Sequence, residues 1–154
     1  MGDYYKPVKP GFEKLRIWKK AYDLMMEVHT ICKTLPLSEK YIFKSQSERS
    51  SSSVVDNIAE SNTSYYYNDK IKAAYVARKE AGETQSHLRK MEGKKYITSD
   101  KTNYLIDEYE GLIRGINAYV NYVCEKRDKV PRHSGERSDS RIVVNLFTTI
   151  LDAL

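Results

Sequence analysis

Apolar residues recur along the first part of the chain with the period of an α-helix. Residues 12–35 contain neither Gly nor Pro and carry two parallel apolar stripes at heptad spacing. The stripes consist of Leu15, Trp18, Tyr22, Met25, His29 and Cys32, and of Ile17, Ala21, Leu24, Val28, Ile31 and Leu35. Together they span about 200° of the helical circumference, whereas a bundle helix needs an apolar stripe of about 100°. The excess predicts that this helix packs on two sides, in a deep core or at a subunit interface.

The second helical segment, at about 39–62, follows a predicted N-cap at Ser38 and contains four consecutive serines at 50–53. A serine run is also typical of flexible linkers. Here apolar residues flank the run at helical offsets and neither Gly nor Pro interrupts it. We therefore expect a helix whose small side chains face a close neighbour. Because serine is a mediocre helix former, this helix depends on tertiary packing.

Two further segments complete the helical pattern. The third, at about 67–93, ends at a glycine that two lysines follow. Its apolar or small positions are Ile71, Ala74, Tyr75, Ala81, Gln85, Leu88 and Met91. The fourth runs from a predicted cap at Ser99 or Asp100 to about Lys126. Its two stripes are Leu105, Tyr109, Leu112, Ile116, Tyr119 and Val123, and Ile106, Ile113 and Val120.

Four such segments joined by short connections predict an all-α fold, an antiparallel up-down-up-down four-helix bundle with a C-terminal extension. We divide the chain into an N-terminal arm (1–11), the bundle (12–126), a polar linker (127–141) and an apolar C-terminal segment (142–154). The apolar segment suits either a short helix or a strand. We expect it to dock on the protein's own oligomer, because an apolar segment left free promotes aggregation.

Composition narrows the class of protein. The 154 residues include only two Cys, too few for a disulfide framework, so a reducing cytoplasm is the expected location. No apolar run approaches the ~18 residues that span a membrane, and the first residues lack the apolar core of a signal peptide. We expect no membrane association. The net charge of +5 permits an acidic partner.

The positive charge concentrates in one stretch. Residues 65–98 contain eight basic and four acidic residues, so they carry +4, whereas 99–125 contain two and five and carry −3. A basic third helix predicts contact with RNA or DNA. The predicted nucleic-acid-binding residues are Lys70, Arg78, Lys79, Arg89, Lys90, Lys94 and Lys95. Tyr65–Tyr67 offers rings for base stacking, although tyrosine is also common in bundle cores and interfaces.

No residues have the spacing of a catalytic motif, so we expect no enzymatic activity and no cofactor. His29 and Cys32 lie at a spacing that suits a metal. However, zinc needs four ligands, and Cys124 belongs to the opposite end of the bundle, so we predict no metal site. Polar residues on helices that should pair predict a structural network, with a ligand site as the alternative. They are Arg49, Asn57, Glu60 and Glu83.

Several motifs resemble a known family. Phe12, Leu15, Trp18 and Ala21 match its F-x-x-L-x-x-W-x-x-A start, and Asn57–Glu60 matches its N-I-A-E block. Further similar stretches are Leu35–Pro36, Gln46–Arg49, Ala77–Glu83, Leu88 and Tyr96–Ile97. Over about 12–126 the chain therefore resembles the four-helix bundle family encoded in intervening sequences of bacterial 23S rRNA genes.

This resemblance implies a homopentamer without enzymatic activity. A divergent branch of the family serves as the accessory protein of diversity-generating retroelements and contacts a reverse transcriptase and nucleic acid. From the double stripes we expect an oligomer interface that includes Ile17, Leu24, Ile31 and Ile113. The sequence thus predicts a homo-oligomeric, non-catalytic bundle that binds RNA or other nucleic acid. The alternative is a protein-binding adaptor, such as an accessory subunit of a reverse transcriptase.

Overall fold

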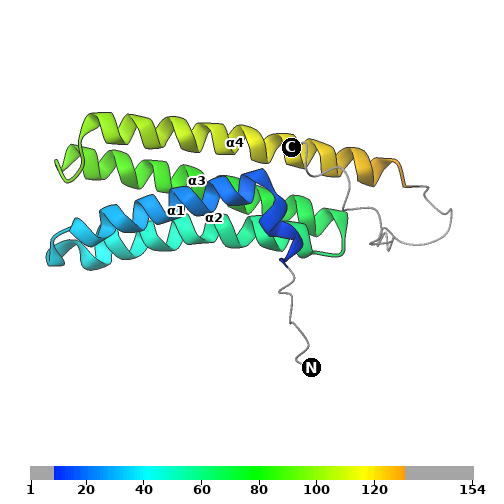
Figure 1. Cartoon of the computed structure of the whole chain (residues 1–154), viewed down its shortest axis with the longest axis horizontal. Coiled ribbons are helices and arrows are strands. Elements are labelled where there is room, and N and C mark those ends of the chain that lie inside the picture. The colour runs from blue at the N-terminus through cyan, green and yellow to red at the C-terminus, as the bar shows by residue number, and fades with distance from the viewer. Residues whose placement is uncertain (1–8, 131–154) are drawn as a thin grey trace, which may run out of the picture.

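The structure, a computed structural model, describes residues 9–130. Four α-helices occupy most of this range, in which no strand occurs. They are α1 (Arg16–Thr34), α2 (Ser45–Thr63), α3 (Tyr67–Gly93) and α4 (Ser99–Asp128). Figure 1 shows the chain reversing direction at each of the three connections, so that every helix lies along its predecessor. The prediction of an all-α four-helix bundle is confirmed.

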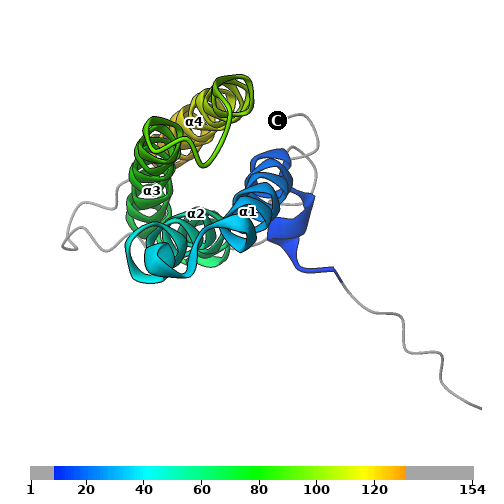
Figure 2. The ribbon, with the colours of Figure 1, turned by 90° about the vertical axis from the view of Figure 1, so that its left-hand side faces the viewer.

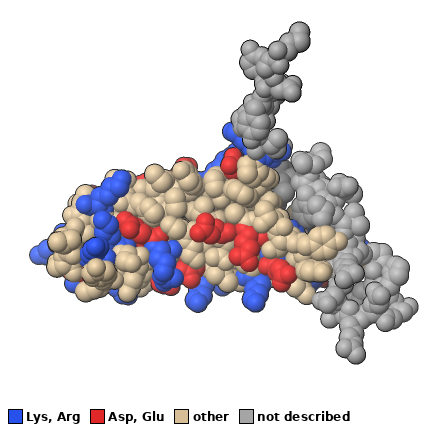
Figure 3. Space-filling model, turned by 90° about the horizontal axis from the view of Figure 1, so that it is seen from below, with Lys and Arg blue, Asp and Glu red and all other residues tan. Residues whose placement is uncertain are grey.

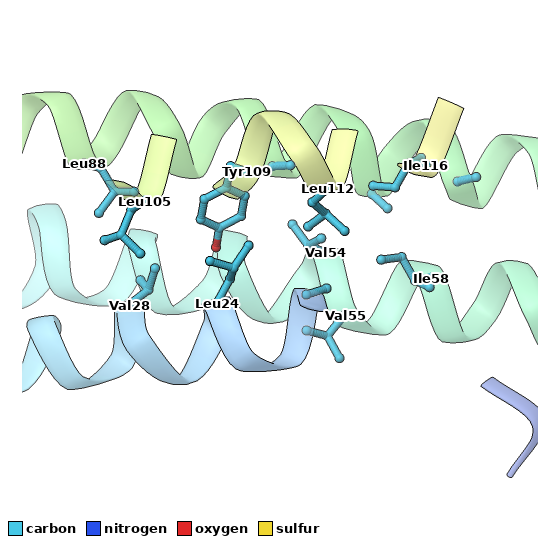
Figure 4. Close-up of a cluster of buried hydrophobic side chains, with 14 of the residues drawn as sticks. Leu24, Val28, Val54, Val55, Ile58, Leu88, Leu105, Tyr109, Leu112 and Ile116 are labelled. Atoms are coloured by element: carbon cyan, nitrogen blue, oxygen red, sulfur yellow. The ribbon is translucent and has the colours of Figure 1, made fainter. Parts of the chain in front are cut away.

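Viewed end-on in Figure 2, the helices form an arc in the order α1, α2, α3, α4. The contact between α2 and α3 is the most extensive, and that between α1 and α4 is the least extensive of the four neighbouring pairs. Figure 4 shows Leu24 and Val28 of α1 reaching toward Leu105 and Tyr109 of α4. All four side chains are buried, so the core fills the inside of the arc.

Serine side chains let α2 and α3 approach closely. Ser47, Ser50 and Ser51 of α2 are fully buried. Across the interface, Ser50 Oγ and Thr84 Oγ1 lie 2.8 Å apart. Within α2, Ser51 Oγ donates to the Ser47 carbonyl at 2.7 Å. These bonds offset the cost of burying the Ser50 and Ser51 hydroxyls. The prediction that the serine run is helical and faces a close neighbour is confirmed.

The start of the first helix differs from its prediction. Residues Gly11–Lys14 form a 3-10 helix, Leu15 is extended with ψ 124°, and α1 begins only at Arg16. This break turns the chain so that Leu15 is buried and the Phe12 ring lies 5.2 Å from the Trp18 ring. Burial of these apolar side chains therefore determines where α1 begins. The apolar pattern of the sequence continues through this break and does not predict it.

The second helix also begins later than predicted. Residues 37–44 form a 3-10 helix and then a π-helix, and Ser38 makes no capping hydrogen bond. The physical reason lies in Glu39, which is buried and accepts hydrogen bonds from Lys94 Nζ at 2.8 Å and Tyr96 OH at 2.7 Å. The bond from Lys94, followed by that from Tyr96, lowers the pKa of the Glu39 carboxyl. This contact ties the α1–α2 connection to the α3–α4 turn.

The fourth helix starts at its predicted position with a different cap. Thr98, rather than Ser99 or Asp100, is the N-cap, and its Oγ1 accepts from the Lys101 backbone N–H at 3.3 Å. At the other end α4 continues through Asp128, so the first two residues assigned to the polar linker are helical.

The remaining expectations about the chain ends lie outside the described residues. Most of the N-terminal arm (1–11), most of the polar linker (127–141) and the whole apolar segment (142–154) fall there. Within 9–130, none of the helices is long and apolar enough to cross a membrane.

Two glycines of α4 face α1, and one of them limits how closely α1 can approach. A Cβ at Gly115 would lie 2.8 Å from Ile17 Cγ2, which is closer than side-chain carbons pack. A Cβ at Gly111 would lie 3.4 Å from Lys20 Nζ. Lys20 in turn pairs with Glu108 of α4 at 2.7 Å. The close α1–α4 approach therefore depends on the missing side chain at Gly115.

We predict that Gly115→Ala destabilises the protein, although alanine is the better helix former. The new methyl group collides with Ile17, at a typical cost of about 1–3 kcal/mol for overpacking. The matched control is Gly82→Ala in α3, where a Cβ meets nothing within 4 Å. That change should stabilise the helix by about 0.5–1 kcal/mol. Thermal unfolding of both variants measures the difference, and equal melting temperatures would contradict the close approach.

Candidate nucleic-acid interface

Most of the predicted basic residues lie on the side of α3 that faces away from the core. The buried side of α3 consists of Lys70, Ala73, Ala74, Ala77, Glu80, Ala81, Thr84, His87, Leu88 and Met91. Arg78, Lys79, Arg89 and Lys90 are exposed. Helical spacing places Lys79 and Lys90 in line with Lys72. We define the α3 outer face as Lys72, Tyr75, Arg78, Lys79, Gly82, Ser86 and Lys90.

Lys70 does not belong to this surface, which corrects its prediction as a phosphate ligand. Its side chain is only 5% exposed, and its Nζ donates to the carbonyls of Asn62 at 2.8 Å and Ser61 at 3.4 Å. In return, Ser61 Oγ donates to the Lys70 carbonyl at 2.6 Å. Burial lowers the pKa of the Lys70 ammonium. Lys70 therefore caps the C-terminal end of α2 and clamps it to α3.

The other predicted phosphate-binding residues differ in whether a carboxylate of the protein pairs with their charge. Arg89 Nη1 lies 2.9 Å from both the Glu92 carboxylate and the Asn103 amide oxygen, and Lys94 pairs with Glu39. These two charges are therefore neutralised within the protein. Arg78 donates to the neutral side chain of Asn117 at 3.1 Å and keeps its full charge.

Lys79, Lys90 and Lys95, together with Lys72, are exposed and pair with no carboxylate in the described part of the chain. Lys95 occupies the turn after α3 with a φ of 62°, a conformation rare outside glycine. The uncompensated positive charge thus follows the α3 outer face and continues into the turn.

Tyr75 is a residue of this surface that the sequence pattern assigned to the core. Its side chain is 50% exposed, and the Arg78 guanidinium lies 6.0 Å from its ring centre. Lys72 and Lys79 are three residues before it and four residues after it, so they flank the ring by one helical turn. Lysines three residues before and four residues after a tyrosine in a helix therefore indicate that the ring faces outward.

Acidic side chains border the α3 outer face. Asp56 and Glu60 are exposed on α2, and Asp107 and Glu110 are exposed on α4. Figure 3 views the molecule from the side on which α2 lies, and shows acidic groups across the middle with basic groups along one edge and at one end. A polyanion is therefore attracted to α3 and repelled by the helices on both sides of it.

Only two of the four residues of the predicted polar network contact each other in the structure. Arg49 and Glu83 come together, with Arg49 Nη2 2.6 Å from Glu83 Oε1, and buried Glu80 lies 3.7 Å from Arg49. Asn57 bonds only within α2, to the Ser53 carbonyl and hydroxyl, and Glu60 is exposed on the outside of α2. Arg49 thus pairs with the Glu83 carboxylate, which lies one turn after Lys79 of the α3 outer face.

Two predicted interface residues are buried within a single chain. Leu24 and Ile31 lie in the core cluster, so they cannot contact another subunit while the bundle is intact. Ile17 and Ile113 are half-buried against the same core. On α1 the exposed large apolar side chains are instead Tyr22 of the other stripe and Met26, which lies outside both stripes; each is more than 40% exposed. The Tyr22 ring stacks on Trp18 at 5.4 Å.

His29 and Cys32 each contact α2 or the connection before it. His29 Nε2 lies 3.3 Å from both the Glu48 carbonyl and Ser52 Oγ, and Cys32 Sγ lies 3.9 Å from the Lys44 carbonyl. Burial, with a smaller effect of Glu48, raises the pKa of the Cys32 thiol to about 12. A thiol in this state is unreactive at neutral pH.

His87 is a titratable group to which the sequence pattern assigns no role. It is buried between α2 and α3, 4.0 Å from Glu83. Burial lowers its pKa, against the opposing effect of the Glu83 carboxylate, and Lys90 and Arg49 add to the decrease. The folded protein therefore favours the neutral form of the His87 ring.

Residues 13–118 match the family described as 23S rRNA-intervening sequence protein. Among solved structures, the chain is similar to a protein of unknown function from the S23 ribosomal protein family of Bacteroides thetaiotaomicron. The two share 22% sequence identity with a TM-score of 0.63, over 68% of this chain and 95% of that chain. No curated protein matches the chain. At this identity, the likeness to the solved structure shows the fold alone.

We predict that His87 makes the protein less stable in mild acid. Its pKa in the folded state lies below the ordinary value, so the unfolded chain binds the proton first, and stability falls as the pH drops below about 6.5. One proton accounts for at most about 1.4 kcal/mol per pH unit. Urea unfolding between pH 7.5 and pH 5.5 should show this loss in the natural chain and a smaller loss in His87→Gln. Identical pH slopes would contradict it.

Proposed function

The chain belongs to the 23S rRNA-intervening sequence protein family, and we propose that it is a non-catalytic, homo-oligomeric bundle that binds nucleic acid through the α3 outer face. The family name makes RNA the first ligand to test. One observation carries the proposal, the row of exposed cations on α3 that no carboxylate of the described chain neutralises. Solvent-exposed lysines of this kind bind phosphates by releasing counterions from the nucleic acid.

Self-association forms the second part of the proposal. The family resemblance implies five chains, and the half-exposed side chains of Tyr22 and Met26 on α1 offer an apolar surface for contact. This face replaces the predicted residues Leu24 and Ile31, whose side chains fill the bundle core. We place the assembly in the cytoplasm, where the thiols of Cys32 and Cys124 stay reduced.

A protein-binding adaptor is the second candidate function, and one surface favours it. At the α1–α2 connection, Leu37, Tyr41 and Ile42 are 84%, 76% and 53% exposed. Lys94 and Lys95 lie at the same end of the bundle, because Lys94 pairs with Glu39 of that connection. Exposed apolar side chains beside lysines suit an acidic protein partner, such as a reverse transcriptase.

We predict that salt weakens RNA binding, and that the logarithm of the affinity falls linearly with the logarithm of the salt concentration. For a single strand, each phosphate contact adds about 0.7 to the slope. The double variant Lys79→Glu/Lys90→Glu should lower affinity and reduce the slope by about 1.4. The matched control is Lys19→Glu/Lys33→Glu, which makes the same change of charge at exposed positions of α1.

Fluorescence anisotropy with a labelled RNA, at 50 to 300 mM salt, gives both quantities. The control pair should retain most of the slope, since its lysines lie on another helix. Equal losses in the two variants would mean that overall charge, and not the α3 outer face, determines binding. Absence of RNA binding at low salt would favour the adaptor function.

We predict that Met26→Lys dissociates the oligomer and leaves the fold intact, because the new charge would be desolvated in the subunit contact but not in the free chain. Light scattering should give about 90 kDa for five chains of 17.9 kDa and a smaller mass for the variant. Asn121→Lys, an exposed position on α4, is the control. A natural chain of 17.9 kDa at micromolar concentration would disprove self-association.

A further inference from the structure

The α3 outer face combines an aromatic ring with cations on three sides. Tyr75 is half exposed, Lys72 and Lys79 lie one turn before and after it, and Arg78 is 6.0 Å from the ring. Asn117 of α4 holds the Arg78 guanidinium through a 3.1 Å hydrogen bond. A ring that serves only the bundle core would be buried, as Tyr109 is. Tyr75 instead presents half of its surface to solvent among positive charges.

We propose that Tyr75 is a stacking platform for an unpaired base, and that the nucleic acid bound by α3 is therefore single-stranded. This inference rests on the proposed function, whose ligand it specifies. An aromatic side chain can stack only on a base whose face is free, and in a duplex both faces of each base are covered by its neighbours. Exposed cations next to the ring supply the phosphate contacts that such a platform needs.

The surface beyond Tyr75 leaves room for the strand to continue. Gly82 and Ser86 follow Tyr75 on the same side of α3, and a Cβ at Gly82 would meet nothing within 4 Å. Lys79 and Lys90 lie beside this line of small residues, about 16 Å apart along the helix axis. A strand stacked on Tyr75 can thus follow α3 past both lysines.

Charge confines the strand to this path. Asp56 and Glu60 on α2, and Asp107 and Glu110 on α4, are exposed on the two neighbouring helices. A duplex is wider than a single strand, and it would bring its second backbone closer to these carboxylates. Repulsion from both neighbours therefore favours the narrower ligand.

The tyrosines before α3 are less suited to this role. Tyr65 and Tyr66 pack edge to face, with ring centres 5.1 Å apart and planes at 86°. Each ring therefore covers part of the other ring and leaves less of it free for a base. No cation contacts either ring in the described part of the chain, whereas Arg78 contacts Tyr75.

The test uses the full chain, a labelled 15-nucleotide single-stranded RNA and the duplex formed with its complement. At equal salt, the natural chain should bind the single strand more tightly. Tyr75→Ala should weaken single-strand binding by about 5- to 150-fold, the range for loss of one base stack, without changing the salt slope or the affinity for duplex. Tyr75→Phe and Tyr75→Trp should retain binding, because they keep a ring.

Gly82→Leu provides an independent variant. It should weaken single-strand binding by blocking the path, although leucine is the better helix former and the bundle should melt no lower. Melting temperatures of all variants check that the fold is intact.

Two results would overturn the inference and leave the proposed function standing. One is unchanged single-strand affinity in Tyr75→Ala while Lys79→Glu/Lys90→Glu weakens binding. The other is tighter binding of the duplex by the natural chain. Absence of binding to either RNA at low salt would overturn both the inference and the proposed function.

Discussion

The close contact between α2 and α3 is the constraint on which the rest of the molecule depends. Serines and alanines let the two backbones approach, and the buried hydroxyls of Ser50 and Thr84 must then align to form their hydrogen bond. At one end of this contact Lys70 caps α2, and Ser61 returns a bond to the Lys70 carbonyl. The rotation of α3 about its own axis is thereby set, and with it the identity of the residues that face solvent.

The charge of the molecular surface follows from that rotation. Glu80 and Glu83 turn toward Arg49 on α2, which removes two acidic groups from the exposed side of α3. Lys79 and Lys90, one turn before and two turns after Glu83, pair with no carboxylate in the described part of the chain. A segment with a modest net charge of +4 thus acquires one strongly basic face between two helices with exposed acidic groups. The arrangement of charges, more than their sum, supports binding to a polyanion.

The ends of the bundle depend on a different interaction. Buried Glu39 accepts from Lys94 and Tyr96, and so connects two turns that are more than fifty residues apart in the sequence. Its carboxylate fixes the backbone of 37–44, and the irregular helical turns there project Leu37 and Tyr41 into solvent. Only the carboxylate of this pair is buried, and the Lys94 ammonium remains 48% exposed, so the pair avoids the cost of desolvating both charges.

Hydrophobic periodicity in the sequence was enough to predict four helices and the helical state of the serine run, because both depend on spacing along one chain segment. The family was indicated by motifs such as Asn57–Glu60. Periodicity cannot tell which of two adjacent stripes faces the core. Tyr75 therefore looked like a core residue and Lys70 like a surface cation, and Leu24 was assigned to a subunit contact that its burial excludes. The break at Leu15 and the late start of α2 were likewise invisible in the pattern. Both result from contacts between distant residues, and only the packing of the whole chain brings those residues together.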